Sequence, residues 1–140
     1  MNSISANLNI MIKASEKASK ILIRDFGELE KLQVSSKGPL DFVTNSDKKV
    51  EKVILNELSK SRKNYSILSE EIGEIKNSDK DNFWIVDPID GTHNYISGLP
   101  IFGVSIALAT KNDFLLGVIN LPFMGLMYSA VKNQGAFLNG

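Results

Sequence analysis

A series of short apolar runs in the second half of the chain most constrains its fold. Turn residues separate these runs, and Lys-Asn-Asp at 111–113 predicts a hairpin between two of them. Short apolar runs bounded by turn signals are typical of buried strands. This half of the chain therefore predicts successive strands with short connections. The predicted strands are Phe83 to Val86, Gly103 to Thr110, Phe114 to Leu121, Met127 to Val131 and Ala136 to Leu138.

The first half of the chain has the spacing of helices. From Ile4 to Phe26, apolar residues recur at steps of three and four, and Gly27 predicts the end of this helix. Thr44 precedes Asp47 by three residues, which resembles a capping box and predicts the start of a second helix. Its apolar face would contain Val50, Val53, Ile54 and Leu58. Its solvent face would contain Lys48, Lys49, Glu51 and Lys52.

The segments around the second helix predict shorter elements. Lys31 to Val34 is compatible with a short strand, and Asn64 to Leu68 alternates weakly, as a strand would. Ser35 to Pro39 has the composition of a loop, and the polar stretch Gly73 to Asn82 predicts a surface loop. Helices followed by closely connected strands indicate an α+β fold, in which two helices cover a largely antiparallel sheet. We expect a single domain over residues 1–140, whose other sheet face needs a partner or more chain.

Composition narrows the possible functions. The 16 basic and 16 acidic residues balance, so charge gives no reason to expect direct binding to nucleic acid or to a membrane. There is no cysteine, which excludes disulfides, thiolate metal sites and cysteine nucleophiles and fits a cytoplasmic location. Met1 to Asn9 lacks the apolar stretch of a signal peptide. The longest apolar run, Ile101 to Ala109, is too short to span a bilayer.

The segment with the most chemical information begins at the apolar run that contains Trp84. Asp87 and Asp90 follow this predicted strand, and Pro88 and Gly91 shape the turn between and after them. Two carboxylates held close together repel each other unless a cation or a proton lies between them. Oxygen ligands favour a hard cation, and Mg²⁺ is the natural candidate. Asp-Pro and Asp-Gly are also common turn pairs, so spacing alone leaves a purely structural turn open.

The same turn offers a place for an anion. Backbone N–H groups near Gly91 and Thr92 could open a helix and bind a phosphate. Carboxylates, a hard cation and an anion site together indicate phosphoryl transfer to water. Glu70 and Glu71, at the end of another predicted strand, are more typical of solvated surface when judged from their spacing alone.

Four segments are similar to the inositol monophosphatase family of Mg²⁺-dependent, Li⁺-sensitive phosphatases. The segment Trp-Ile-Val-Asp-Pro-Ile-Asp-Gly-Thr-His-Asn-Tyr at 84–95 resembles the family's signature. Three further matches stand in the right order: Asp41 to Asp47, Ile67 to Glu71 with Ser69 in place of a glycine, and Gly135 to Gly140. The resemblance implies the N-terminal part of an αβαβα sandwich.

The resemblance also implies a set of metal ligands. Glu70, Asp87 and the backbone carbonyl of Ile89 would hold one Mg²⁺. Asp87 would bridge to a second metal ion, which Asp90 would also bind. In the family, a later Trp-Asp segment completes the second metal site and contacts the substrate alcohol, and this sequence contains no such segment.

Further roles follow from the same resemblance. Glu70 and Thr92 would position the attacking water, with Asp47 orienting the Thr92 hydroxyl. The backbone amides of Gly91 and Thr92 would hold the phosphate. His93 stands where the family usually has another polar residue, which indicates a polar replacement on the turn or an influence on substrate preference. Two more residues would lie beside the site: Glu71 and Lys37.

The function implied is hydrolysis of a small phosphate monoester, with inositol 1-phosphate as the default substrate and a homodimer as the expected assembly. Related branches act on nucleotide 3′-phosphates or sugar bisphosphates. Some bacterial relatives instead act through protein contacts in transcription antitermination and RNA processing, and a decayed, inactive remnant is a third alternative. The short length is compatible with a deliberately shortened chain, a gene decayed by a frameshift or stop, or a natural short form completed by another chain.

Overall fold

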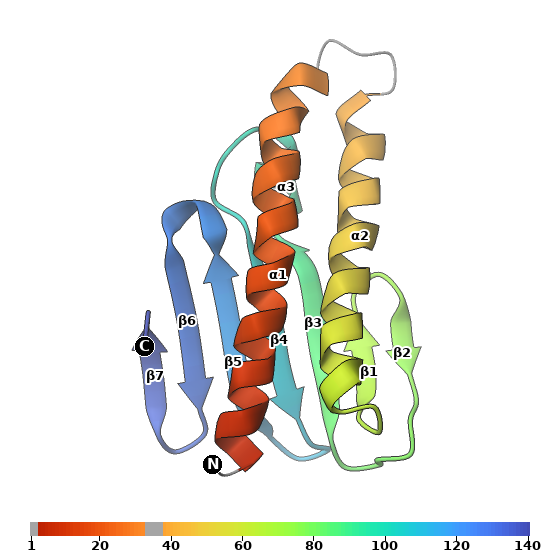
Figure 1. Cartoon of the computed structure of the whole chain (residues 1–140), viewed down its shortest axis with the longest axis vertical. Helices are drawn as coiled ribbons and strands as arrows, with labels where there is room; N and C mark the ends of the chain where they lie inside the picture. The colour runs from red at the N-terminus through yellow and green to blue at the C-terminus, as the bar shows by residue number, and fades with distance from the viewer. Residues whose placement is uncertain (1–2, 33–37) are drawn as a thin grey trace.

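Two long helices lie side by side on one face of a single sheet (Figure 1). The computed structural model describes residues 3–32 and 38–140. Helix α1 spans Ser3–Leu32 and α2 spans Gly38–Ser61, and a short helix α3, Thr92–Ile96, follows the third strand. The remaining elements are β1 (Ser66–Ser69), β2 (Gly73–Ile75), β3 (Phe83–Asp90), β4 (Gly103–Ala109), β5 (Phe114–Leu121), the 3₁₀ turn η1 (Pro122–Met124), β6 (Leu126–Val131) and β7 (Gly135–Leu138).

The sheet has seven strands in the order β2-β1-β3-β4-β5-β6-β7. Strands β1 and β3 are parallel, and every other neighbouring pair is antiparallel. From β3 onward each strand pairs with the next one in the chain, as the short connections predicted. The α+β fold with two helices on a largely antiparallel sheet is therefore confirmed.

The core lies between the helices and one face of the sheet. Alternate strand residues point toward the helices, because side chains along a strand alternate between the two faces. Burial of these apolar surfaces is the main stabilising contribution to such a fold. From the helices, the core contains Met11, Ala14, Ala18, Leu22, Val50, Ile54 and Leu58. From the strands, it contains Trp84, Val86, Val104, Ile106, Leu108, Leu116 and Val118.

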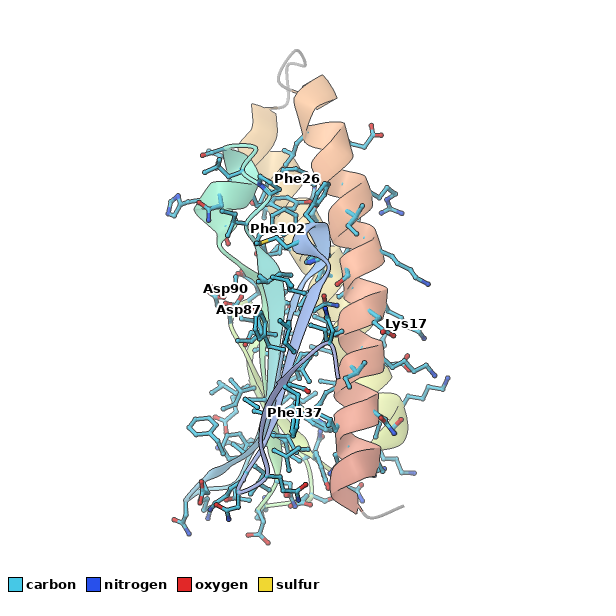
Figure 2. The ribbon with its side chains drawn as sticks, turned by 90° about the vertical axis from the view of Figure 1, so that its left-hand side faces the viewer. Lys17, Phe26, Asp87, Asp90, Phe102 and Phe137 are labelled. Atoms are coloured by element: carbon cyan, nitrogen blue, oxygen red, sulfur yellow. The ribbon has the colours of Figure 1, made fainter. Side chains whose placement is uncertain are left out.

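Within the described residues, neither α1 nor α2 covers the opposite face of the sheet, and α3 lies only at its upper end (Figures 1 and 2). The strand registers align Asp87, Ser105, Ile119, Tyr128 and Leu138 in one row on that face. Ile119, Tyr128 and Leu138 are between 42% and 50% exposed. The exposed apolar residues of this row therefore lie on the same face of the sheet as Asp87, near the end of β3. No helix in the described part of the chain is long and apolar enough to cross a membrane.

The helix boundaries differ from the predicted ones. Helix α1 continues past Gly27 to Leu32, because another turn buries Leu29 on the core side. Helix α2 begins at Gly38, before the predicted capping residue Thr44, whose hydroxyl donates to the Leu40 carbonyl at 2.9 Å inside the helix. The predicted strand at 31–34 is therefore wrong at its helical residues 31–32, and the predicted loop at 35–39 is wrong at 38–39. Residues 33–37 lie outside the described ranges.

Two further predictions need correction. The predicted loop Gly73 to Asn82 contains the short edge strand β2, which pairs with β1 through Ile67 and Ile75. Glu51, predicted to face solvent, is 7% exposed because it points toward the end of β1.

Candidate active site

The candidate site lies at the end of β3, on the side of the sheet away from α1, where Figure 2 labels Asp87 and Asp90. Residues three apart on a regular strand point to opposite faces. Here the register shifts, because Asp87 pairs with Ser105 whereas Asp90 pairs with Gly103. Three steps along β3 thus match two along β4, as in a β-bulge. Pro88, which has no amide hydrogen for the ladder, suits this interruption.

Parallel pairing of β1 with β3 brings Glu70 to Asp87. Ser69 pairs with Val86, and the Glu70 amide donates to the Val86 carbonyl at 3.1 Å. The Glu70 and Asp87 carboxyl groups lie within interaction range of each other, and repulsion between like charges favours a proton or a cation between them. Burial, the contact with Glu70 and the charges of Glu70 and Asp90 raise the pKa of Asp87 well above its ordinary value.

A second carboxyl pair lies beside the first. Asp47, on α2, forms a hydrogen-bonding contact with Glu71, the residue after Glu70. Burial, the contact with Glu71 and the charges of Glu71, Asp87 and Glu51 raise the pKa of Asp47. Acidic groups are therefore concentrated where α2, β1 and β3 meet, in a protein with no net charge.

The turn after β3 is built around Gly91. Its φ of +83° lies in the left-handed region that favours glycine, and an added Cβ would lie 3.0 Å from the Ile101 carbonyl oxygen. The residue thus cannot be replaced without strain. Helix α3 begins at the next residue, Thr92, whose hydroxyl donates to the Ile89 carbonyl at 3.0 Å. The Tyr95 amide donates to the Gly91 carbonyl at 3.0 Å, which closes the first turn of α3.

These residues line one surface pocket of about 390 Å³. The pocket includes six of the residues that the sequence predicts for metal and substrate binding, and it adds two polar neighbours from α3. Asp47 and Glu71 lie beside it rather than in its wall. Lys37 lies outside the described residues. The lining residues are Glu70, Asp87, Ile89, Asp90, Gly91, Thr92, His93 and Asn94.

That Asp47 orients the Thr92 hydroxyl stays a prediction. The described contact of Asp47 is with Glu71, and the described hydrogen bond of the Thr92 hydroxyl is with Ile89. The Ile89 carbonyl oxygen has a second lone pair, so accepting from Thr92 leaves it able to bind a cation.

The donor chemistry of the pocket fits a hard cation such as Mg²⁺. Among the described residues, 3–32 and 38–140, one buried oxygen of Asp87 and one of Asp47 find no hydrogen-bond partner. A buried oxygen without a partner lowers the stability of the folded protein unless a cation or a hydrogen-bond donor binds it. Within residues 3–32 and 38–140, no group of three or more histidine, aspartate or glutamate side chains is placed to hold a metal ion by itself. Each predicted metal site contains only two carboxylates, so the Ile89 carbonyl or other oxygen donors would have to complete it.

Sequence analysis also missed Glu51, which lies behind the pocket rather than in its lining. Its Oε2 atom accepts hydrogen bonds from the Ser69 hydroxyl at 2.5 Å and from the Ile72 amide at 3.1 Å. Its place one helical turn after Asp47 was a signal that it shares the same face of α2. The pattern of charges around it indicated a solvated face instead.

Several known proteins are similar to this chain. An inositol-1-monophosphatase of Mesorhizobium japonicum is 48% identical over 135 residues, which cover 96% of this chain and 51% of the relative. The Nus factor SuhB of Escherichia coli is 40% identical over 133 residues, which cover 95% of this chain and 50% of the relative. The crystal structure of the extragenic suppressor protein suhB from Bartonella henselae matches with a TM-score of 0.85 at 41% identity, over 96% of this chain and 51% of that one.

The structure of an inositol monophosphatase from Anabaena matches with a TM-score of 0.82 at 32% identity, over 99% of this chain and 48% of that one. The chain thus spans about half the length of the relatives it matches. The model of the inositol monophosphatase family matches residues 5–140, which include all the described strands and the candidate pocket. The predicted resemblance is therefore confirmed, and the chain belongs to the inositol monophosphatase family.

Proposed function

We propose that this chain provides the metal- and phosphate-binding part of a Mg²⁺-dependent phosphate monoester hydrolase, with an inositol phosphate as substrate. The observation that carries the proposal is the meeting of the Glu70–Asp87 carboxyl pair with the Gly91–Thr92 turn in one pocket. A cation site and an anion site side by side are what phosphoryl transfer to water requires. The name of the Mesorhizobium relative supports the choice of substrate.

Six residues of the pocket have a proposed role. Glu70, Asp87 and the Ile89 carbonyl would hold one Mg²⁺, and Asp87 with Asp90 would contribute to a second site. Mg²⁺ bound there would lower the pKa of a water molecule and offset the charge of the phosphate.

The other roles belong to the chain's own groups. Glu70 and the Thr92 hydroxyl would orient the attacking water, and Asp47 would orient the Thr92 hydroxyl once that hydroxyl turns away from the Ile89 carbonyl. The Gly91 and Thr92 amides would bind the phosphate oxygens. The left-handed conformation of Gly91 supports this role, because it directs the chain into α3 immediately after Asp90.

The chain's short span relative to its relatives limits which parts of the reaction it can supply. We propose that residues 1–140 form the N-terminal domain of the family fold, that the reaction is cytoplasmic, and that selectivity for the substrate alcohol is completed by groups outside this chain or from a second copy. We also propose that the 140-residue chain has phosphatase activity without further chain.

A direct test is phosphate release from inositol 1-phosphate, measured with and without Mg²⁺ for the wild-type chain and for Asp87→Asn. We expect turnover that requires Mg²⁺ and falls about 100-fold or more in the variant. The substituted amide would retain the shape of the Asp87 side chain and relieve carboxyl repulsion, so circular dichroism should show the same fold. Equal Mg²⁺-dependent turnover in both proteins would exclude Asp87 from the proposed role.

A second candidate function follows from the similarity to the Nus factor SuhB of Escherichia coli. In this alternative the chain acts by binding protein partners in transcription antitermination or RNA processing, and the pocket is not used. Affinity capture with the transcription machinery of the source cell distinguishes the two. Partners retained equally by the wild-type chain and by Asp87→Asn, with no phosphatase activity in either, would favour the alternative.

A further inference from the structure

We propose that Glu51 is a positioning residue that holds the Glu70–Glu71 turn in the geometry needed to bind a divalent cation. The inference rests on the proposed function, because it concerns the same pocket. Glu51 does not line the pocket. Its effect would therefore pass through the turn that connects β1 to β2.

The contacts of Glu51 fall on both sides of that turn. Its Oε2 atom accepts from the Ser69 hydroxyl at 2.5 Å and from the Ile72 amide at 3.1 Å. These two donors come immediately before Glu70 and immediately after Glu71. Ser69 is 2% exposed and Glu51 is 7% exposed, so the hydrogen bond between them is shielded from water. The bond from the Ile72 amide is only partly buried, because Ile72 is 56% exposed. A single carboxylate oxygen on α2 therefore fastens the turn at both ends.

Besides Glu51, the turn is held by the pairing of Ser69 with Gly73 and by the hydrogen bond from the Glu70 amide to the Val86 carbonyl. Strand β1 has four residues, and β2 has three and lies at the edge of the sheet. Glu70 and Glu71 are both exposed, and the carboxyl group of each lies beside that of another acid, Asp87 or Asp47 respectively. Carboxyl pairs tend to separate when both groups ionise. A hydrogen-bonded support behind metal ligands typically changes metal affinity 10–100-fold when it is removed.

Asp47 and Glu51 form one functional face of α2. They are separated by one helical turn and therefore point to the same side. Asp47 contacts Glu71, while Glu51 holds the backbone on either side of the Glu70–Glu71 pair. The two side chains together fix the position of β1's end relative to α2.

The chain contains a matched control for a purely structural glutamate. Glu57 lies on the same helix, is also 7% exposed, and pairs with Lys17 and Lys13. Neither contact touches the turn. Methionine has a side chain about as long as that of glutamate but carries no carboxylate. Replacing either glutamate with methionine therefore removes a buried hydrogen-bonding group and keeps most of the side-chain volume. Only the Glu51 substitution should affect cation binding.

The experiment is Mg²⁺ titration by isothermal calorimetry on the full chain, with Glu51→Met, Glu51→Gln and Glu57→Met beside the wild type. We expect Glu51→Met to weaken Mg²⁺ binding about 10–100-fold. Glu51→Gln should bind within about threefold of wild type, because its amide oxygen can take the place of Oε2 and accept from both the Ser69 hydroxyl and the Ile72 amide. Glu57→Met should leave the Mg²⁺ affinity unchanged.

Amide hydrogen exchange followed by NMR without Mg²⁺ adds a readout that does not depend on cation binding. The Ile72 amide should exchange about tenfold faster in Glu51→Met than in the wild type, and not in Glu57→Met. Should Glu51→Met fail to fold, Ser69→Ala removes one of the two hydrogen bonds and should weaken Mg²⁺ binding by a smaller factor.

The outcomes separate the two proposals. A wild-type chain that binds no Mg²⁺ overturns the proposed function and this inference with it. Mg²⁺ affinity that is equal in the wild type, Glu51→Met and Ser69→Ala overturns the inference alone. Equal exchange of the Ile72 amide in the wild type and Glu51→Met also overturns it, because the turn would then not depend on Glu51.

Discussion

At the scale of single residues, Gly91 is the position where backbone geometry most directly limits the sequence. Its φ is +83°, and an added Cβ would lie 3.0 Å from the Ile101 carbonyl oxygen. We expect Gly91→Ala to lower the free energy of unfolding by about 1–3 kcal/mol, through left-handed strain and the close contact. It should also move the Thr92 amide and reduce Mg²⁺-dependent turnover. Urea denaturation and phosphate release measure the two effects.

Gly98→Ala is the matched control for this prediction. Gly98 has a similar φ of +79°, but an added Cβ there would meet nothing within 4 Å. It should show the strain alone, without a loss of turnover. Similar activity losses in both variants would mean that the Gly91 turn has no special part in the site.

A site residue could be predicted when its partners lie close to it in the sequence. Asp87 to Thr92 form one continuous segment, so turn chemistry alone brought their carboxylates and amides together in the prediction. Glu70 needed the family resemblance, because β1 lies beside β3 only in the folded chain. The contacts of Glu51 were not predicted, since its partners lie 18 and 21 residues further along the chain and lysines at 48, 49 and 52 suggested a solvated face.

At the scale of elements, Glu57 connects the two helices. Its carboxylate lies 2.6 Å from the Lys17 Nζ atom and 3.3 Å from that of Lys13. The hydrogen bond from Lys17, then that from Lys13 and the two positive charges lower the pKa of Glu57 below 4.5, against a smaller effect of burial. A lowered pKa means that the pair stabilises the protein above the unfolded pKa. The contribution disappears as pH falls through the folded pKa.

The corresponding prediction is a pH-dependent difference between the wild type and Glu57→Gln. Because both lysines are about half exposed, we expect Glu57 to contribute roughly 0.5–1 kcal/mol near pH 7. The difference should shrink as pH falls below about 4.5, where the unfolded glutamate is protonated. Urea denaturation at several pH values measures it. A difference that grows as the solution becomes more acidic would contradict the lowered pKa.

The elements themselves were predicted best where the apolar pattern was long. The strands from β3 onward matched their predicted positions within four residues at most. Strands β3, β4 and β5 bury alternate side chains against the helices, whereas every residue of β7 is exposed. Helix ends were predicted poorly, since they depended on tertiary packing. Gly27 was expected to end α1, but the burial of Leu29 favours a further turn over the local preference of glycine.

At the scale of the whole molecule, one face of the sheet is well covered and the other is not. The uncovered row begins at Asp87 and continues through Ser105 to Ile119, Tyr128 and Leu138. The last three are each at least 42% exposed, and they are neighbours across adjacent strands. Contiguous apolar surface of this kind favours association in water. The candidate pocket therefore lies at one end of a surface suited to contact with other protein.

This asymmetry predicts concentration-dependent self-association of the 140-residue chain. Sedimentation velocity should show a rising mean sedimentation coefficient as concentration increases. Ile119→Lys combined with Tyr128→Lys should shift the association midpoint at least tenfold, because charged side chains would have to be desolvated at the contact. Ile23→Lys is the control, since Ile23 is also 42% exposed but lies on α1, away from this face. Association that persists in the double variant and is lost in Ile23→Lys would place the contact on the helices. The open face of the sheet would then have no part in it.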